Sequence, residues 1–390
     1  MAQKRSLGLG NIGVGIAALS CAALLITACG SDSGSDTGTN ASGGSGADGG
    51  SGANGGSGAN GGNGGTGGAN GGNGGTDGGS GGVGAQGGSA GAGANGGAAG
   101  SGANGGNGGS GAVTSNECFA DIQDGLIVWD YDVLGISTGS HCHGTNHQDI
   151  QGIERIVYLG DSIMNGTPPT PSGQFVRTQL DTQLKALFPG VQTKSCAVNG
   201  ARNDDLMKSQ IPNCFGDANT RNVKTLTLVI SGGNDIAAIA RDKPDLATSQ
   251  AEAAGYVDEM RSAIEYLKDS TNFPMGNDVV FANIYEYTDT SADLSSCPAA
   301  GFAGLSGTWL NGAQVLVGMN EGYAKIAVDT GADMVFMMEQ FCGHGYRRDR
   351  MDLQCYRGAN TEQWFDISCI HPTPAGHTAL AGFFMDVIQE

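Results

Sequence analysis

The residues with the clearest chemical potential lie at positions 155–162. An apolar run over residues 156–159 predicts a buried strand, and the chain turns at Gly160 before it reaches Ser162. A serine at the point where a parallel strand meets a helix is a recurring way to present a nucleophile. Ser162 is therefore a candidate nucleophile, with capping of the following helix as the simpler alternative.

Attack on an ester also needs a general base and hydrogen-bond donors for the oxyanion. His371 lies in a loop just before the last predicted helix and is the best candidate for the base. The candidate donors of the oxyanion hole are the backbone N–H groups of Ser162 and Gly200 and the side-chain amide of Asn234. Together these residues predict acyl transfer through an acyl-enzyme.

Apolar runs and helix-length segments alternate along the part of the chain that carries these residues. The runs that predict strands cover residues 156–159, 191–198, 226–230, 279–284 and 334–338, and the helical segments cover residues 174–188, 249–269, 311–330 and 375–388. Such alternation predicts an α/β domain whose parallel sheet is covered by helices on both faces. Because the carboxyl ends of parallel strands share one edge, we expect the chemistry to gather there.

Four short blocks of the sequence resemble those of the SGNH (GDSL) hydrolase family. Residues 160–163 look like its first block, residues 199–202 are similar to the second, residues 232–235 (Gly-Gly-Asn-Asp) match the third, and His371-Pro372 looks like the fifth. The resemblance covers about residues 154–390. It implies a flavodoxin-like three-layer α/β/α sandwich, the oxyanion roles of Gly200 and Asn234, and hydrolysis of ester, thioester or O-acyl bonds without a metal or other cofactor.

The acidic residue that would orient the catalytic histidine departs from the family's pattern in its position. The family usually places an aspartate three residues before the histidine, and that position is Ser368 in this chain. The nearest acidic residue is Asp366, five residues before His371. Three groups therefore remain open as the partner that orients His371: Asp366, Ser368 and a backbone carbonyl.

Other residues match catalytic or ligand-binding patterns less well. Ser137 lies in a Gly-x-Ser-x-Gly pattern of another hydrolase fold, but the helix that this motif requires is not predicted after it. A second cluster has the residue types of a zinc site, namely His141, Cys142, His143 and His147. A disulfide explains Cys142 better on an exported chain, so we expect no metal. Arg347, Arg348 and Arg350 could meet an anionic substrate, although such a run is more often a solvated loop.

The first 112 residues differ in composition from the rest of the chain. Residues 1–29 have a basic start, an apolar middle and a small-residue end, as a secretory signal peptide does. Their end resembles a bacterial lipobox, which implies lipid attachment at Cys29, with ordinary signal cleavage as the alternative. Residues 30–112 are rich in glycine and nearly free of large apolar side chains, so they predict a disordered tether. The sequence thus predicts an extracytoplasmic lipoprotein, anchored at the outer membrane or cell surface.

Residues 113–390 form the predicted hydrolase domain, with residues 113–153 as its N-terminal extension. Its cysteines are Cys118, Cys142, Cys196, Cys214, Cys297, Cys342, Cys355 and Cys369. An even number of cysteines on an exported chain predicts disulfides, whose connectivity the sequence leaves open. Short loops favour the pairs Cys196–Cys214 and Cys342–Cys355.

The charge of the chain bears on its partners. Nineteen Lys and Arg residues stand against 38 Asp and Glu residues, for a net charge of −19, which disfavours nucleic acids and anionic membrane surfaces as partners.

Taken together, the motifs and the export signals predict a surface-anchored serine esterase acting on O-acyl esters of small molecules, polysaccharides or lipids, for example a carbohydrate O-acetyl esterase. The alternatives are a lysophospholipase or thioesterase, and an inactive surface binding module. The sequence leaves the oligomeric state open.

Overall fold

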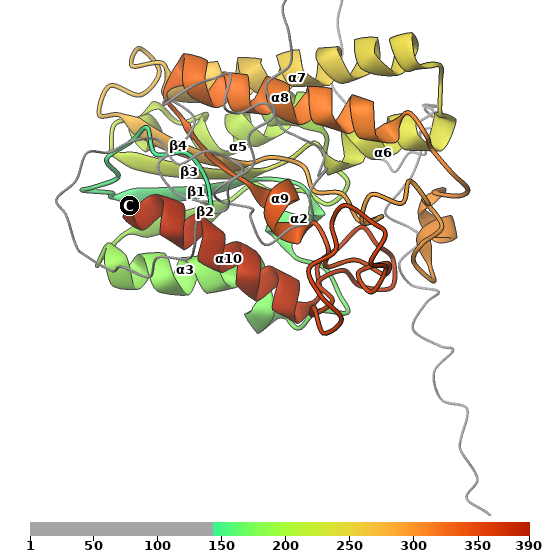
Figure 1. Cartoon of the computed structure of the whole chain (residues 1–390). Coiled ribbons are helices and arrows are strands. Elements are labelled where there is room, and N and C mark those ends of the chain that lie inside the picture. Colours follow the sequence, from blue (N-terminus) through green and yellow to red (C-terminus); the bar gives the residue numbers. More distant parts are fainter. Residues whose placement is uncertain (1–142) are drawn as a thin grey trace, which may run out of the picture. The chain divides into compact units, whose positions relative to one another are not determined.

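The computed structural model describes residues 143–390 of the chain (Figure 1). The predicted signal peptide with Cys29, the tether and most of the N-terminal extension lie outside this region. Ser137, His141 and Cys142 lie outside it as well. The predictions made for these residues stay predictions.

Five parallel strands form the central sheet of the described region. They are β1 (Arg155–Gly160), β2 (Gln192–Ser195), β3 (Thr225–Ile230), β4 (Asn277–Ala282) and β5 (Asp333–Val335). Their order across the sheet is β2-β1-β3-β4-β5, which is the order of flavodoxin-like folds. The fold class predicted from the sequence is confirmed. In this order the chain reverses its direction of travel across the sheet between β1 and β3, where open α/β sheets place their ligands.

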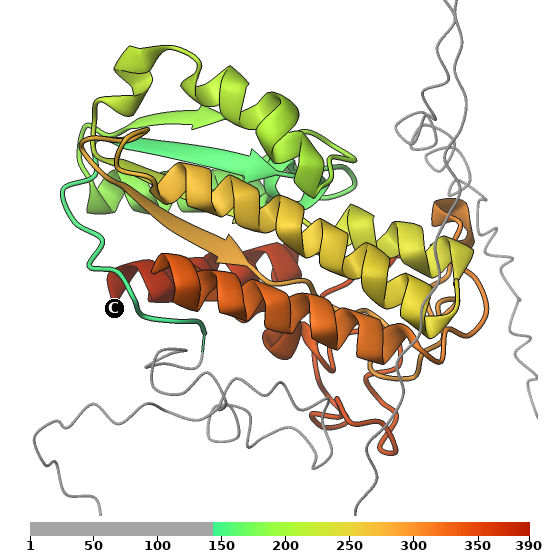
Figure 2. The same ribbon diagram turned by 90° about the horizontal axis from the view of Figure 1, so that it is seen from above.

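Helices cover both faces of the sheet. On one face lie α3 (Val176–Leu187) and α10 (Pro374–Gln389), and on the other lie α5 (Ile211–Phe215), α7 (Leu246–Lys268) and α8 (Gly312–Thr330) (Figures 1 and 2). The sequence of β1 explains two cores, because successive side chains of a strand point to opposite faces. Ile156 and Tyr158 pack in the core under α3 and α10. Val157 and Leu159 pack in the core under α7 and α8.

Short elements complete the described region. They are α2 (Ser162–Asn165), α4 (Asn203–Asp205), a π-helical segment (Leu206–Gln210), α6 (Gly233–Asp242) and α9 (Met337–Phe341), with 3₁₀ turns at Ser172–Gln174, Ala218–Arg221 and Ala300–Ala303. The sequence analysis predicted only the first of them, as the helix that follows Ser162. Most are shorter than the window over which helical periodicity can be recognised.

The predicted strand over residues 334–338 is wrong at its end. β5 stops at Val335, and α9 begins at Met337. Asn283, just past β4, accounts for the turn, because its backbone N–H donates to the Val335 carbonyl (3.1 Å). Its side-chain Oδ1 accepts a hydrogen bond from the backbone N–H of Met338 (2.8 Å), which caps the helix start.

Residues 143–147 run along β5 at the edge of the sheet. Gly144 makes an antiparallel bridge with Val335, and the Thr145 N–H donates to the Met334 carbonyl (2.9 Å). The Thr145 hydroxyl also donates to Asp333 (3.0 Å). The edge strand β5 is thus covered by chain rather than left open.

The described region contains three disulfides: Cys196–Cys214, Cys297–Cys369 and Cys342–Cys355. The first and the third confirm the pairs that short loops favoured. The second joins residues 72 positions apart, a separation that sequence spacing does not single out.

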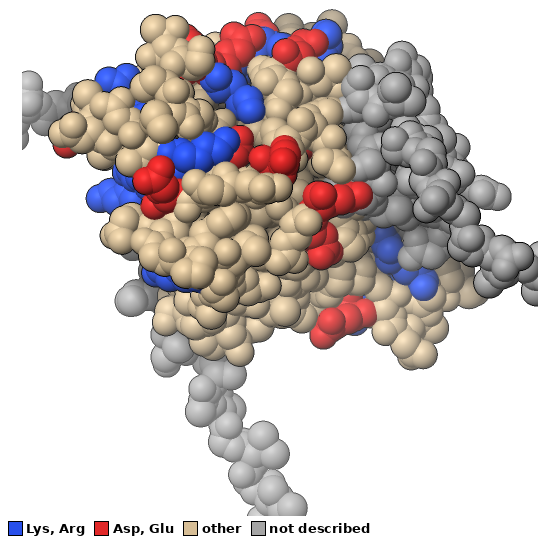
Figure 3. Space-filling model, turned by 90° about the vertical axis from the view of Figure 1, so that its left-hand side faces the viewer, with Lys and Arg blue, Asp and Glu red and all other residues tan. Residues whose placement is uncertain are grey.

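The surface of the domain mixes charges of both signs. On the face in Figure 3, Lys and Arg side chains lie among Asp and Glu side chains rather than gathering by sign. Ion pairs in the described region include Lys224–Asp278 (2.7 Å) and Arg261–Asp329 (2.9 Å). None of the helices within residues 143–390 combines the length and the apolar character needed to cross a bilayer.

We expect Gly160→Ala to lower the free energy of unfolding by about 2–5 kcal/mol, because backbone strain and steric overlap add. Gly160 has a φ of 124°, and a Cβ there would lie 1.9 Å from the Ile230 carbonyl oxygen. Denaturant unfolding measures the effect. Gly255→Ala in α7 is the matched control, since an added Cβ meets nothing within 4 Å. We expect it to stabilise by roughly 0.5–1 kcal/mol. Equal stability of Gly160→Ala and wild type would contradict the close approach of β1 and β3.

Candidate active site

Ser162 and His371 meet at the carboxyl edge of the sheet, although 209 positions separate them along the chain. The Nε2 atom of His371 lies 2.9 Å from the Oγ atom of Ser162. Ser162 is the first residue of α2, directly after β1. His371 comes two residues before Thr373, whose hydroxyl caps the N-terminus of α10. A serine hydroxyl and an imidazole at this distance can exchange a proton.

Asp161 holds the turn that presents Ser162. Its backbone N–H donates to the Ile230 carbonyl at the end of β3 (2.9 Å). Its Oδ1 accepts a hydrogen bond from the Ile163 N–H (2.9 Å), so the side chain caps α2. The carboxyl is buried, and burial raises its pKa to about 7. Asp161 therefore stabilises the turn that presents Ser162.

The side chain of Gln210 makes two hydrogen bonds with the backbone of Gly160. Its side-chain Oε1 accepts from the Gly160 N–H (2.7 Å), and its Nε2 donates to the Gly160 carbonyl (2.9 Å). Gln210 is fully buried at the end of the π-helical segment. The sequence analysis missed this residue, since a lone glutamine carries no motif.

Two of the predicted oxyanion donors lie in neighbouring segments: Gly200 in the turn after β2, and Asn234 in the first turn of α6. The Val198 N–H donates to the Gly160 carbonyl (3.0 Å), which places the loop with Gly200 beside the end of β1. Gly200 has a φ of 80°, a conformation that favours glycine. The side-chain amide of Asn234 donates to the Ala201 carbonyl (2.9 Å). An amide nitrogen carries two hydrogens, so Asn234 keeps a second one for a ligand.

A buried polar network connects the segment of Gly200 to the segment of Asn234. The Asn203 N–H donates to Asp235 Oδ2 (3.2 Å), and the Asn203 side-chain amide donates to the Tyr323 hydroxyl (2.7 Å). The Ser231 hydroxyl donates to Asn203 Oδ1 (2.7 Å). Asp235 is fully buried, and burial raises its pKa to about 7. Asp235 thus joins the loop of Gly200 to that of Asn234. The sequence analysis missed Asn203, although it follows the second block directly.

A tight hairpin over residues 364–373 places Asp366 opposite His371. The Asp366 N–H donates to the His371 carbonyl (2.9 Å), and Phe365 makes an antiparallel bridge with Pro372. Residues directly opposite each other in an antiparallel pair have their side chains on the same face. Asp366 Oδ2 accordingly lies 4.0 Å from His371 Nδ1. Pairing across a hairpin thus accommodates the five-residue spacing.

Ser368 holds Asp366 rather than the imidazole. Its backbone N–H (2.8 Å) and its hydroxyl both donate to Asp366 Oδ1. The second carboxylate oxygen, Oδ2, faces His371. Burial lowers the pKa of His371, while the charge of Asp366 opposes this shift. The imidazole is therefore neutral at pH 7 and able to accept a proton.

The remaining candidate groups of the sequence analysis have structural partners. Arg347 pairs with Asp293 (2.8 Å), Arg348 donates to the Thr361 carbonyl (2.9 Å), and Arg350 pairs with Asp352. The Nδ1 atoms of His143 and His147 lie 2.6 Å from Asp386 Oδ2 and 2.8 Å from the Ala332 carbonyl oxygen, respectively. Within residues 143–390, no three His, Cys, Asp or Glu side chains are grouped as a metal site requires.

Comparison with known proteins identifies the family. The fold and the serine–histidine contact are those of a hydrolase with a flavodoxin-like α/β fold. Residues 158–379 match the model of the GDSL-like lipase/acylhydrolase family, so the chain belongs to this family. The protein is a hydrolase that acts on ester bonds. A search of curated proteins gave no match.

Several solved structures are similar to this chain. A protein described as a GDSL-like lipase from Parabacteroides merdae is 15% identical, with a TM-score of 0.42 over 62% of this chain and 99% of that chain. An acetylxylan esterase from Geobacillus stearothermophilus is 16% identical, with a TM-score of 0.39 over 62% and 97%. A phospholipase A1 from Streptomyces albidoflavus is 18% identical, with a TM-score of 0.38 over 61% and 99%.

Proposed function

We propose that the protein is a serine esterase in which Ser162 attacks the acyl carbon of a carboxylic ester. The observation that carries the proposal is the distance of 2.9 Å between Ser162 Oγ and His371 Nε2. His371 takes the proton of the hydroxyl as Ser162 forms the new bond, and Asp366 stabilises the resulting imidazolium. The backbone N–H groups of Ser162 and Gly200 and the side-chain amide of Asn234 donate to the oxyanion.

The second half of the reaction reverses the proton transfer. The imidazolium of His371 gives its proton to the leaving alcohol, and the acyl group stays on Ser162 Oγ. Water then attacks the acyl carbon with His371 again as the base, the bond between Ser162 Oγ and the acyl carbon breaks, and the imidazolium returns its proton to Ser162 Oγ as the acid is released. No cofactor enters this proposed sequence of steps.

The substrate that we propose lies outside the cell. The sequence predicts export, lipid attachment at Cys29 and a long tether, which together would hold the domain at the outer membrane or cell surface. O-acyl esters of surface or environmental molecules, such as acetylated polysaccharides, fit an enzyme held in this way.

One observation favours a second candidate, a lysophospholipase or thioesterase that accepts long acyl chains. Phe302 is 73% exposed and Ile367, next to Asp366, is 57% exposed. The loops that carry them are joined, because the Ala299 N–H donates to the Ile367 carbonyl (2.8 Å). Exposed apolar side chains beside an active site offer contact area to an acyl chain.

A fluorophosphonate probe tests the proposed nucleophile. We expect covalent labelling of the wild-type protein and none of Ser162→Ala, because the probe reacts with an activated serine hydroxyl. Intact-protein mass spectrometry measures the adduct. Ser172→Ala in a 3₁₀ turn is the control and should label as the wild type does. The absence of labelling of the folded wild-type protein would contradict the proposal.

Asp366→Asn should lower the acylation rate at least ten-fold, which is about 1.4 kcal/mol. The carboxylate of Asp366 raises the pKa of His371, so its removal lowers that pKa further. The acid limb of kcat/KM, where activity rises as His371 loses its proton, should therefore move to lower pH. Stopped-flow kinetics across pH measures both effects. Asp386→Asn, which removes an exposed aspartate paired with His143 (2.6 Å), is the matched control. An unchanged rate would assign the role to another group.

A panel of p-nitrophenyl esters from acetate to palmitate, with acetylated sugars, tests the acyl group. We expect kcat/KM to be at least ten-fold higher for acetyl than for palmitoyl esters. Phe302→Ser should then leave the acetyl esterase activity unchanged. The reverse order of chain lengths, with loss of palmitoyl activity in Phe302→Ser, would establish the second candidate instead.

A further inference from the structure

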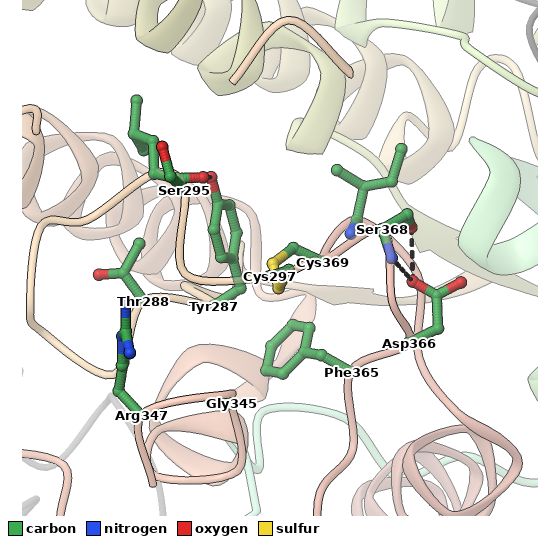
Figure 4. Close-up of a disulfide and its surroundings, with 12 residues drawn as sticks. Tyr287, Thr288, Ser295, Cys297, Gly345, Arg347, Phe365, Asp366, Ser368 and Cys369 are labelled. Atoms are coloured by element: carbon green, nitrogen blue, oxygen red, sulfur yellow. Dashed lines mark hydrogen bonds between the residues drawn. A yellow bond between two sulfur atoms is a disulfide. The ribbon is translucent and has the colours of Figure 1, made fainter. Parts of the chain in front are cut away.

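The tip of the Asp366–His371 hairpin is tied covalently to a loop that follows β4. Cys369, two residues before His371, forms a disulfide with Cys297. Figure 4 shows this disulfide between the two loops, with Asp366 and Ser368 on the same hairpin. Both cysteines are buried, with exposed fractions of 5% for Cys297 and 0% for Cys369. Side chains of Tyr287 and Phe365 lie around the sulfur atoms (Figure 4).

Cys369 has a backbone conformation that the local sequence does not favour. Its φ is 68°, in the left-handed region, where residues other than glycine are strained. Its N–H closes a turn by donating to the Asp366 carbonyl (3.1 Å). A strained residue persists only when its surroundings impose the conformation. The bond to Cys297 is such a constraint.

This turn fixes the carboxylate of Asp366. Aspartate at the first position of a turn accepts a hydrogen bond from the N–H two residues later, and Ser368 supplies it (2.8 Å). With Oδ1 held in this way, Oδ2 is the oxygen that lies 4.0 Å from His371 Nδ1. The conformation of Cys369 and the position of the acid are therefore parts of one turn.

Two weaker contacts hold the same hairpin. The Ala299 N–H donates to the Ile367 carbonyl (2.8 Å), and the Tyr285 hydroxyl donates to the Ile370 carbonyl (2.7 Å). Both contacts end on carbonyls of the tip and leave the carboxylate of Asp366 untouched. They can preserve the fold of the loop when the disulfide is absent, but they do not impose the left-handed conformation at residue 369.

We propose that Cys297 and Cys369 are positioning residues of the esterase, and that their disulfide holds Asp366 in place to orient His371. This inference rests on the proposed function of Ser162, His371 and Asp366. A dithiol reductant switches the effect off. Its two thiols give two electrons and two protons, the S–S bond breaks, both cysteines become thiols, and the reductant becomes a cyclic disulfide.

The test compares disulfide variants of the full chain. We expect Cys297→Ala/Cys369→Ala to lower kcat/KM three- to ten-fold, mainly through kcat. The acid limb of its pH profile should shift to lower pH, as for Asp366→Asn. A smaller fraction of folded protein would lower kcat/KM by the same factor at every pH and would leave the acid limb where it is. Cys342→Ala/Cys355→Ala removes a different disulfide and is the matched control. Its acid limb is expected to lie where that of the wild type does.

A double-mutant cycle shows whether the disulfide acts through Asp366. In the Asp366→Asn background, removal of both cysteines should change kcat/KM by less than two-fold. A full three- to ten-fold loss in that background, or wild-type activity in the original one, would overturn the inference. If the alanine pair does not fold, Cys297→Ser/Cys369→Ser serves with the same readouts, because serine is close to cysteine in shape but forms no disulfide and leaves the strained conformation at residue 369 without its constraint. An inactive wild-type protein that resists the fluorophosphonate probe would instead refute the proposed function.

Discussion

The site depends on one close approach, that of the end of β1 to the end of β3. Gly160 leaves no room for a side chain between its backbone and the Ile230 carbonyl, and Asp161 donates its N–H to the same carbonyl. The two blocks that carry Ser162 and Asn234 follow these strand ends directly. Their separation is therefore fixed by sheet pairing rather than by loop conformation, which is the precision that a preorganised oxyanion site needs.

Much of the fold could be predicted because the signals are local and repeated. The strands β1, β3 and β4 and the long helices α3, α7, α8 and α10 each have several apolar residues at their own period, and tertiary packing agrees with that pattern. β2 is the exception, since its residues Gln192–Ser195 are all polar. The end of β5 could not be predicted in this way. The apolar run continues to Met338, but Asn283 from a distant segment turns the chain with hydrogen bonds to both sides of the break.

The site was predictable to the extent that it is built from short blocks. The positions of Ser162, Gly200 and Asn234 follow from blocks that come after strand ends, and the sheet brings those ends to one edge. The position of His371 follows from the block just before the last helix. Gln210 and the Cys297–Cys369 disulfide carry no such signal, since their contacts join segments far apart in sequence. The spacing of Asp366 looked unfavourable for a similar reason. Asp366 lies five positions from His371 along the chain, but the hairpin pairs the two residues directly across its strands.

The contact between Ser162 and His371 also reports on folding. It spans 209 positions, and His371 lies on a hairpin that the Cys297–Cys369 disulfide ties to the loop after β4. A partly unfolded state in which α10 has detached would keep the pairing of β1 with β3 and this disulfide, but it would loosen the segment that joins His371 to the helix, and with it the imidazole. Local openings of this kind cost less than global unfolding. Enzymatic turnover should therefore disappear earlier in a thermal ramp than the β-sheet structure does.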